Sequence, residues 1–244
     1  VLVTDVDELP PEITGSEYPQ FYDKGSGNKT LRITATDNKA ITSVTVFRKG
    51  IGEKTEQQET LSLISAPNYS FQFNESMLDN MGMDFRFEVS DAAGNKATDS
   101  GAVYLRFPSA ASPSIPSLIF GGTKETYQII AIPYELEDNS VTGIFNELGT
   151  YDKNKWRLLT YNNSNNTYRE FDDFLTIDKG TGYWFNAVNE VSNIAIGAGN
   201  AIQKNHDNPF VINLKGNEWN QIGNPYPFAI SWDDAKAAND NRDD

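Results

Sequence analysis

The sequence predicts a mainly β protein with two domains, and three observations carry this prediction. Segments in which apolar and polar residues alternate recur through roughly the first 100 residues, as half-buried strands require. Residues 109–117 are small, polar and interrupted by proline, a composition that predicts a linker. Beyond this linker, an aromatic residue, a short apolar run and Pro-Tyr occur in that order twice, at 127–134 and at 219–226. We therefore expect a β-sandwich at 1–108, and a β-rich domain with short helices and an internal repeat at 118–244.

The composition argues against several classes of protein. The 244 residues include no cysteine, so the chain has neither a disulfide framework nor a thiolate metal site. The formal net charge is −14, which argues against nucleic acid and anionic membranes as partners because both require clustered Lys and Arg. No apolar run reaches the roughly 20 residues that a membrane-spanning helix needs. An acidic excess usually serves solubility, and it can also supply ligands for Ca²⁺.

The first domain is predicted from strand-like segments that are separated by turn residues. These segments lie at 31–35, 41–47, 69–73, 84–90 and 102–107. Gly94 and Asn95 can take the positive φ that a tight hairpin needs. The pattern is that of about seven short strands in about 100 residues, which is typical of an immunoglobulin-like sandwich.

Three motifs of the first domain carry a family resemblance. Residues 7–13 read Asp-Glu-Leu-Pro-Pro-Glu-Ile, residues 36–46 contain Asp-Asn followed by spaced Ile and Val, and residues 89–97 contain Asp-Ala-Ala-Gly-Asn. In this order they resemble the first strand, the central strand pair and the last hairpin of bacterial Ig-like surface domains. The resemblance implies the fold and says almost nothing about a ligand.

The second domain is predicted to mix strands with short helices. Asn139 and Ser140 precede apolar residues spaced as in an amphipathic helix of about two to three turns, which Gly149 ends. The sequence also predicts a hairpin with an Asn-rich turn and further strands, in segments 156–161, 167–171, 180–185, 191–196 and 210–214.

The repeat recurs beyond its strand. Pro133 and Pro225 are 92 residues apart, and Ser231 then caps a second predicted helix at 233–238. The second copy lacks counterparts of the hairpin and of the strand at 180–185. We therefore expect this chain to be a piece of a larger protein.

The same residues resemble an element of large, type IX-secreted proteins of Bacteroidetes-type bacteria. That element reads Trp-x-x-Ile-Gly-Asn-Pro-Tyr-Pro…Trp after Gly-x-Gly-Tyr-Trp, and its counterparts here are 219–227 with Trp232, and 180–184. The resemblance implies an extracellular or cell-surface location. It also implies a position between a catalytic or adhesive region and a C-terminal sorting domain.

No pattern of catalytic residues stands out. The chain has one histidine, His206, in a polar run and without a Gly-x-Ser-x-Gly nucleophile motif or a zinc motif. Glu170, Asp172-Asp173 and Asp233-Asp234 are the carboxylates from which a glycoside hydrolase could draw a pair. We predict that the protein is not an enzyme and has no catalytic residue, and we keep a hydrolase as the least favoured alternative.

Acidic residues in the predicted turns of the first domain suggest a calcium site. Loops from distant strands gather at one end of a sandwich, so Asp5, Asp7, Asp37 and Asp91 can converge there. The competing interpretation, which we favour, is a set of Asx-turns and solvated charges with no cofactor.

Aromatic residues of the second domain suggest a glycan platform. Flat rings beside amides suit sugar recognition, and Trp156, Tyr161 and Tyr168, which lie near the Asn-rich turn, are the members expected to be exposed. The competing interpretation is that these rings fill the core. The function that the sequence favours is a non-catalytic extracellular accessory segment, used for spacing, adhesion or presentation. Its partners would be the rest of the parent polypeptide and a glycan or cell-surface protein, and a carbohydrate-binding module is the alternative.

Overall fold

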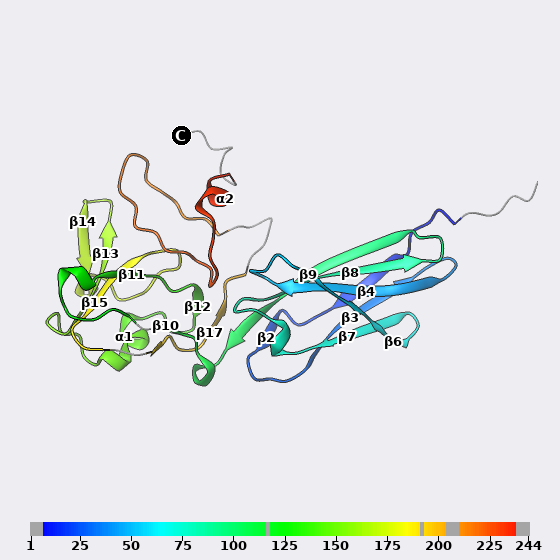
Figure 1. Ribbon diagram of the computed structural model, residues 1–244, viewed down its shortest axis with the longest axis horizontal. Helices are drawn as coiled ribbons and strands as arrows, with labels where there is room; N and C mark the ends of the chain where they lie inside the picture. The colour runs from blue at the N-terminus through cyan, green and yellow to red at the C-terminus, as the bar shows by residue number, and fades with distance from the viewer. Residues whose placement is uncertain (1–6, 116–117, 191–192, 204–209, 238–244) are drawn as a thin grey trace, which may run out of the picture. The chain divides into compact units, whose positions relative to one another are not determined.

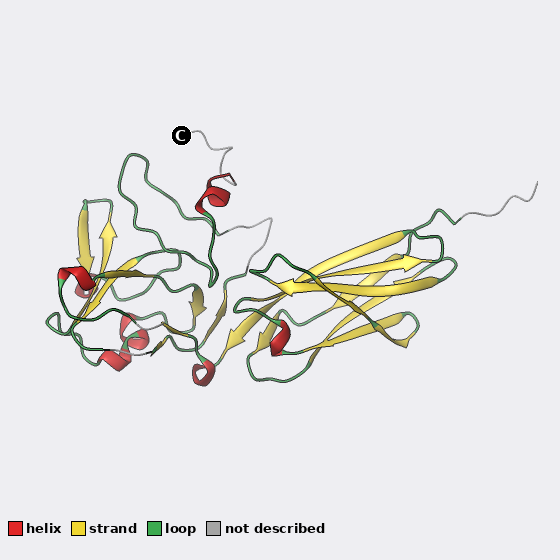
Figure 2. Cartoon of the chain, in the orientation of Figure 1, coloured by secondary structure: helices red, strands yellow, loops and turns green. Residues whose placement is uncertain are grey.

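The computed structural model describes residues 7–115, 118–190, 193–203 and 210–237 (Figure 1). The fold is mainly antiparallel β, and Figure 2 shows that its helices are short. The chain divides into two compact units between Leu105 and Arg106. In the described residues no helix is both long and apolar enough to cross a membrane.

The first unit is built from two antiparallel sheets. One sheet has the order β1 (Glu12–Glu17), β3 (Lys29–Thr36), β7 (Asn68–Phe73), β6 (Ser62–Ser65). The other has the order β9 (Lys96–Phe107), β8 (Gly82–Asp91), β4 (Ile41–Gly50), β5 (Gln57–Thr60), with β2 (Phe21–Asp23) also paired to β9. Taken in chain order, these sheets are the A-B-E-D and G-F-C-C′ sheets of an immunoglobulin domain. The predicted Ig-like sandwich is therefore confirmed.

Side chains that point inward at every second position along the strands form the core of this sandwich. In β8, every second residue from Met83 to Val89 is buried, and in β3 Leu31, Ile33 and Ala35 are buried. Side chains of both strands belong to one apolar cluster. Full burial of each large apolar side chain stabilises the fold by about 1.5–3 kcal/mol. A single-turn 3₁₀ helix, Glu75–Met77, joins β7 to β8.

The second unit is centred on a smaller antiparallel sheet. Its order is β11 (Gln128–Ile130), β15 (Tyr183–Ala187), β13 (Trp156–Asn162), β14 (Thr167–Glu170). Two-strand pairings accompany it, between β10 (Ser114–Ile115) and β16 (Ile194–Ala195), and between β12 (Tyr134–Leu136) and β17 (Gly199–Ala201). The helices are α1 (Val141–Ile144), α2 (Trp232–Ala237) and the 3₁₀ turns Ser109–Ala111, Lys124–Thr126, Asn146–Leu148 and Phe171–Asp173.

Helix α1 covers this sheet, although it is shorter than the sequence predicts. Its cap is Ser140, whose Oγ accepts from the Gly143 amide, and the chain leaves the following 3₁₀ turn at Gly149 with φ +70°. The Phe145 ring then stacks on both Trp156 and Phe185, at centroid distances of 5.8 and 5.7 Å. Tertiary packing on these rings, rather than helix length, therefore holds this segment in place.

The segment predicted as a linker is structured as far as residue 115. Ser109–Ala111 forms a 3₁₀ turn, and Ser114–Ile115 pairs with Ile194–Ala195. Ile115 is buried in the core of the second unit. Ile115 therefore anchors an otherwise small and polar stretch to the second unit, and the boundary between the units lies a few residues before the predicted one.

The second copy of the repeat forms less structure than the first. Instead of a strand, Ile222 forms an isolated antiparallel bridge to Thr181, and the predicted strand at 210–214 is wrong because these residues adopt no regular structure. Two glycines allow the close backbone approach at this bridge. A Cβ on Gly182 would lie 2.7 Å from the Ile222 carbonyl oxygen, and a Cβ on Gly223 would lie 2.6 Å from that of Thr181. Both distances are below van der Waals contact, so glycine is required here.

Candidate functional site

Three of the four predicted calcium ligands meet at one end of the first unit. Asp7 precedes β1, Asp37 follows β3 and Asp91 ends β8. One carboxylate oxygen from each lies within 4.8 Å of the others. Asp5 lies outside the described residues. We call Asp7, Asp37 and Asp91 the acidic cluster.

Backbone turns position each member of the acidic cluster. Asp37 Oδ1 accepts from the amides of Lys39 and Ala40 at 2.9 and 2.8 Å, which is the geometry of an Asx-turn. Asp91 Oδ1 accepts from the Asn95 amide at 2.8 Å. The Asn95 side chain donates to Asp91 Oδ2 at 2.8 Å and to the Asp7 carbonyl oxygen at 3.0 Å. Asn95 therefore ties the start of the chain to the turn between β8 and β9.

The turns do not use every oxygen of the acidic cluster. Asp37 Oδ2 is buried and accepts no hydrogen bond from the described residues. Burial opposes ionisation of Asp91, but the hydrogen bonds from Asn95 outweigh it and hold the pKa of that carboxyl below its ordinary value. Within the described chain, no Lys or Arg forms an ion pair with any of the three. The available donors are oxygens only, the ligand chemistry that Ca²⁺ takes.

The predicted exposure of Trp156 is wrong. This side chain is 4% exposed, and its ring stacks on Phe145 and Phe171 while Tyr151 meets its edge at 4.9 Å. Trp156 has the same parity along β13 as Leu158, which is fully buried, so the strand directs both inward. Trp156 is a core residue.

Tyr161 and Tyr168, by contrast, lie together near the surface. They are direct cross-strand partners in the β13–β14 hairpin, and their rings meet edge-on at 5.2 Å. Tyr168 is 51% exposed, and Asn166 closes the turn with φ +55°. The Asn-rich turn thus supplies the left-handed residue that a short hairpin needs.

Tyr161 also lines a hollow of about 560 Å³, which we call the hairpin hollow. Sequence analysis missed its opposite wall, the irregular segment 174–181. The residues that line the hairpin hollow include Tyr161, Asn162, Asn163, Arg169, Leu175 and Asp178.

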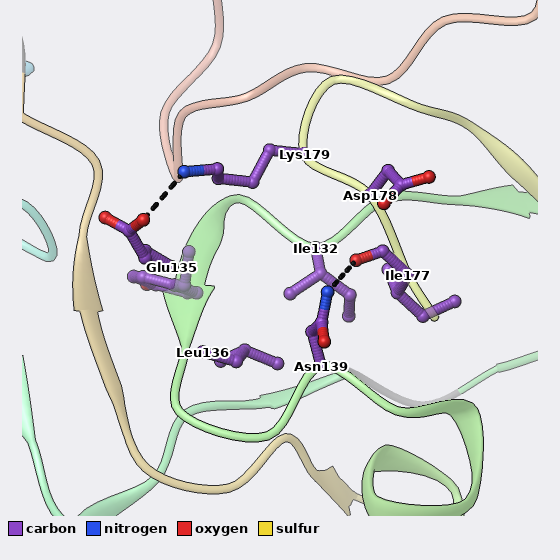
Figure 3. Close-up of a pocket in the computed structure, with 8 residues that line it drawn as sticks. Ile132, Glu135, Leu136, Asn139, Ile177, Asp178 and Lys179 are labelled. Carbon is purple, nitrogen blue, oxygen red and sulfur yellow. Dashed lines mark hydrogen bonds and ion pairs between the residues drawn. The ribbon is translucent and has the colours of Figure 1, made fainter. Parts of the chain in front are cut away.

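A second hollow of about 140 Å³ is too small for a sugar ring with its water shell (Figure 3). Its apolar part includes Ile132 and Ile177, and Asn139 Nδ2 donates to the Ile177 carbonyl oxygen at 3.2 Å. Glu135 and Lys179 form an ion pair at 2.9 Å across one side, and Lys179 lowers the pKa of Glu135. At about 30 Å³ per water molecule, this space holds only a few waters.

Glu170, one candidate for a hydrolase pair, takes part in a structural ion pair. Arg157 Nε and Nη2 donate to its two oxygens at 2.7 and 2.9 Å, Tyr151 donates to Oε1, and Arg157 Nη1 donates to the Tyr127 hydroxyl oxygen. The hydrogen bonds from Arg157 hold the pKa of Glu170 below its ordinary value. A general acid needs a raised pKa, so this environment favours a structural role for Glu170.

The other candidate catalytic residues give no assembled site. Asp172 is exposed, and Asp233 pairs with Lys236 within the exposed helix α2. The side chain of Asp173 and all of His206 lie outside the described residues.

Comparisons with known proteins assign no family to this chain. No family model matches this sequence, and no curated protein matches it. Among solved structures, the N-terminal Ig1-2 module of the Drosophila receptor protein tyrosine phosphatase DLAR is similar to this chain. The similarity covers 80% of this chain and 96% of the DLAR module. The identity is 13% and the TM-score is 0.32. The Ig-like assignment therefore rests on the strand order of the first unit.

Proposed function

We propose that this chain is a non-catalytic accessory segment of a larger bacterial surface or secreted protein, which spaces and presents neighbouring domains. One observation carries the proposal: the chain enters and leaves the first unit at opposite ends. Asn95 holds Asp7 and Leu9 beside the turn where β9 begins. β9 then runs without a break from Lys96 past Leu105. At about 3.3 Å per residue, the points of arrival and departure are roughly 30 Å apart.

This geometry suits a spacer. A module whose ends lie at opposite poles adds its long axis to the polypeptide, whereas a module with adjacent ends adds little length. Load applied through the ends would be carried by the hydrogen-bond ladders of the sandwich. The extracellular and bacterial parts of the proposal rest on the two sequence resemblances.

The acidic cluster sits where the chain arrives, so it adds a second element to the proposal. We infer that Ca²⁺ bound by Asp7, Asp37 and Asp91 would fasten the chain to the end of the sandwich. Support comes from the convergence of the three carboxylates and from the unpaired, buried Asp37 Oδ2. A cation would offset the mutual repulsion of the three anions.

Single-molecule force spectroscopy on the full chain, pulled from its two ends, tests this proposal. We expect a discrete unfolding event that releases about 100 residues, at roughly 3.5 Å per residue, and a higher rupture force in Ca²⁺ than in chelator. Asp37→Asn should remove the Ca²⁺ effect and keep the event, and Asp99→Asn, at a half-buried position of β9 outside the acidic cluster, is the matched control. Smooth extension of the first unit without an event would contradict the spacer. A rupture force that does not respond to Ca²⁺ would contradict the cation alone.

A further inference from the structure

The hairpin hollow has the dimensions of a small-ligand site. Its volume of about 560 Å³ falls within the range of roughly 300–1,000 Å³ that is usual for ligand pockets. Its walls come from the end of β13 with the following turn, from β14, and from segment 174–181. All of these parts belong to the second unit and lie within the described residues.

The apolar surface of the hollow combines a braced ring with an uncovered aliphatic side chain. Tyr161 is half-buried, and its ring is supported edge-on by Tyr168. Leu175, on the facing wall, is 70% exposed. A flat ring and an aliphatic rim are suited to the C–H face of a sugar ring.

Polar groups beside this apolar surface retain hydrogen-bonding capacity. Asn162 Oδ1 accepts from the Ser164 amide at 3.0 Å, but its Nδ2 group donates to no described residue. The Asp178 carboxylate is exposed and accepts no hydrogen bond from the described residues, and Figure 3 shows it directed away from the Glu135–Lys179 pair. An amide donor and a carboxylate acceptor on opposite walls match the hydroxyl groups of a sugar.

The second copy of the repeat holds one wall of the hollow in place. Asn163 Nδ2 donates to Asn220 Oδ1 at 3.1 Å, and Lys215 Nζ donates to the Asn163 carbonyl oxygen at 3.1 Å. The turn that carries Asn162 and Asn163 is therefore hydrogen-bonded from outside the hairpin, which restricts the orientation of its amides. Pre-orientation lowers the cost of binding.

Charge in the hollow favours a neutral ligand. Arg169 and Asp178 both line it and carry opposite charges. The Arg169 guanidinium lies over the Phe174 ring, with its central carbon 5.8 Å from the ring centroid. The exposed Asp178 carboxylate would repel an anion, whereas it can accept hydrogen bonds from the hydroxyl groups of a neutral ligand.

We propose that the hairpin hollow binds a short neutral glycan of one or two hexose rings, with Tyr161 as the stacking residue and Asn162 and Asp178 as hydroxyl partners. This goes beyond the proposed function, because a spacer requires no ligand. It assigns to the second unit a recognition role that is independent of the first.

The test is a calorimetric titration of the full chain with neutral disaccharides of glucose, galactose, mannose and N-acetylglucosamine, and with an acidic disaccharide of galacturonic acid. We expect at least one neutral disaccharide to bind at millimolar concentration or below. Tyr161→Ala should weaken it roughly tenfold, because the stacking surface is lost. Asp178→Asn, which keeps the shape of an exposed side chain, should weaken it by a smaller factor.

Matched controls distinguish binding at the hairpin hollow from nonspecific binding to exposed aromatic rings. Trp232→Ala removes an exposed aromatic ring outside the hollow and should leave the affinity unchanged. The proposal is overturned if no neutral disaccharide binds, if the acidic one binds best, or if binding survives both Tyr161→Ala and Asp178→Asn. Binding that Trp232→Ala weakens as much as Tyr161→Ala does would overturn it as well.

Discussion

The two copies of the repeat begin with similar sequences and end in different environments. In the first copy, Gln128–Ile130 forms a strand paired with β15, and Ile130, Ile132 and Tyr134 are buried. In the second copy, Ile222 makes one bridge, Trp219 is 63% exposed and Trp232 is 58% exposed. Strands β13 to β15 accompany the first copy, and among the described residues no strand pairs with the second copy in this way. Similar local sequences therefore do not suffice to form an ordered sheet here, and we infer that partner strands decide whether this unit becomes one.

The two copies also contact each other at equivalent positions. Gly223 is the counterpart of Ala131, and a Cβ added to Gly223 would lie 2.5 Å from the Ala131 Cβ. At the first position of the unit they differ in chemistry. Tyr127 accepts a hydrogen bond from Arg157, whereas Trp219, which replaces it, has an indole N–H that can only donate.

We expect the greatest difference in folding stability between replacing a tryptophan of the β11–β15–β13–β14 sheet and replacing one of the second copy. Trp156→Ala should destabilise the second unit by about 3–5 kcal/mol, because it leaves a cavity among stacked rings. Trp219→Ala should cost within about 0.5 kcal/mol, because its ring is largely in solvent. Urea unfolding followed by circular dichroism measures both. Similar losses for the two variants would mean that the second copy is packed more tightly than this structure shows.

A medium effect is expected where the second copy meets the sheet. Gly182→Ala would place a methyl group against the Ile222 carbonyl and should cost about 1–3 kcal/mol, either as strain or as detachment of the second copy. Gly216→Ala is the matched control, since a Cβ there would meet nothing within 4 Å and should be nearly neutral. Thermal melting compares the two, and equal melting temperatures would count against close backbone approach at Gly182.

The smallest change in stability is expected for the ion pair between Arg157 and Glu170, which lies beside the first copy. The pKa of Glu170 is lowered in the folded state, so its contribution is present above the unfolded pKa near 4.5 and is lost as pH falls through the folded pKa. Both side chains are partly exposed, so Glu170→Gln should cost only about 1 kcal/mol at neutral pH. The difference between wild type and variant should shrink in acid. A difference that stayed constant from pH 7 to the acid limit would contradict the assigned pKa shift.

The features that the sequence could predict are those with a short period or a local rule. Alternation located β3, β4, β7 and β8, and this was sufficient for the Ig-like fold. Because loops gather at the ends of a sandwich, it was also possible to anticipate that Asp7, Asp37 and Asp91 lie together, as the structure places them. Ser231 was identified from local capping chemistry, and its Oγ accepts from the Asp234 amide at 3.3 Å.

The features that the sequence could not predict depend on contacts between distant segments. Proximity to an Asn-rich turn suggested exposure of Trp156, but the parity it shares with Leu158 was the stronger signal. Segment 174–181 has no periodicity, so nothing in its sequence indicates that it faces Tyr161 across the hairpin hollow. Ile115 anchors the predicted linker only because Ile194, far along the chain, lies opposite it.

Hydrogen exchange measured by mass spectrometry shows whether partner strands determine how ordered each copy of the repeat is. We predict that peptides containing 128–130 and 183–187 exchange as slowly as the core of the second unit, and that peptides from 210–237 exchange much faster. Slow exchange at 219–223 alone would fit the backbone hydrogen bond from Gly223 to Gly180, at 2.8 Å. Equal protection across both copies would contradict the account, because it would show that the second copy is ordered without the strands that cover the first.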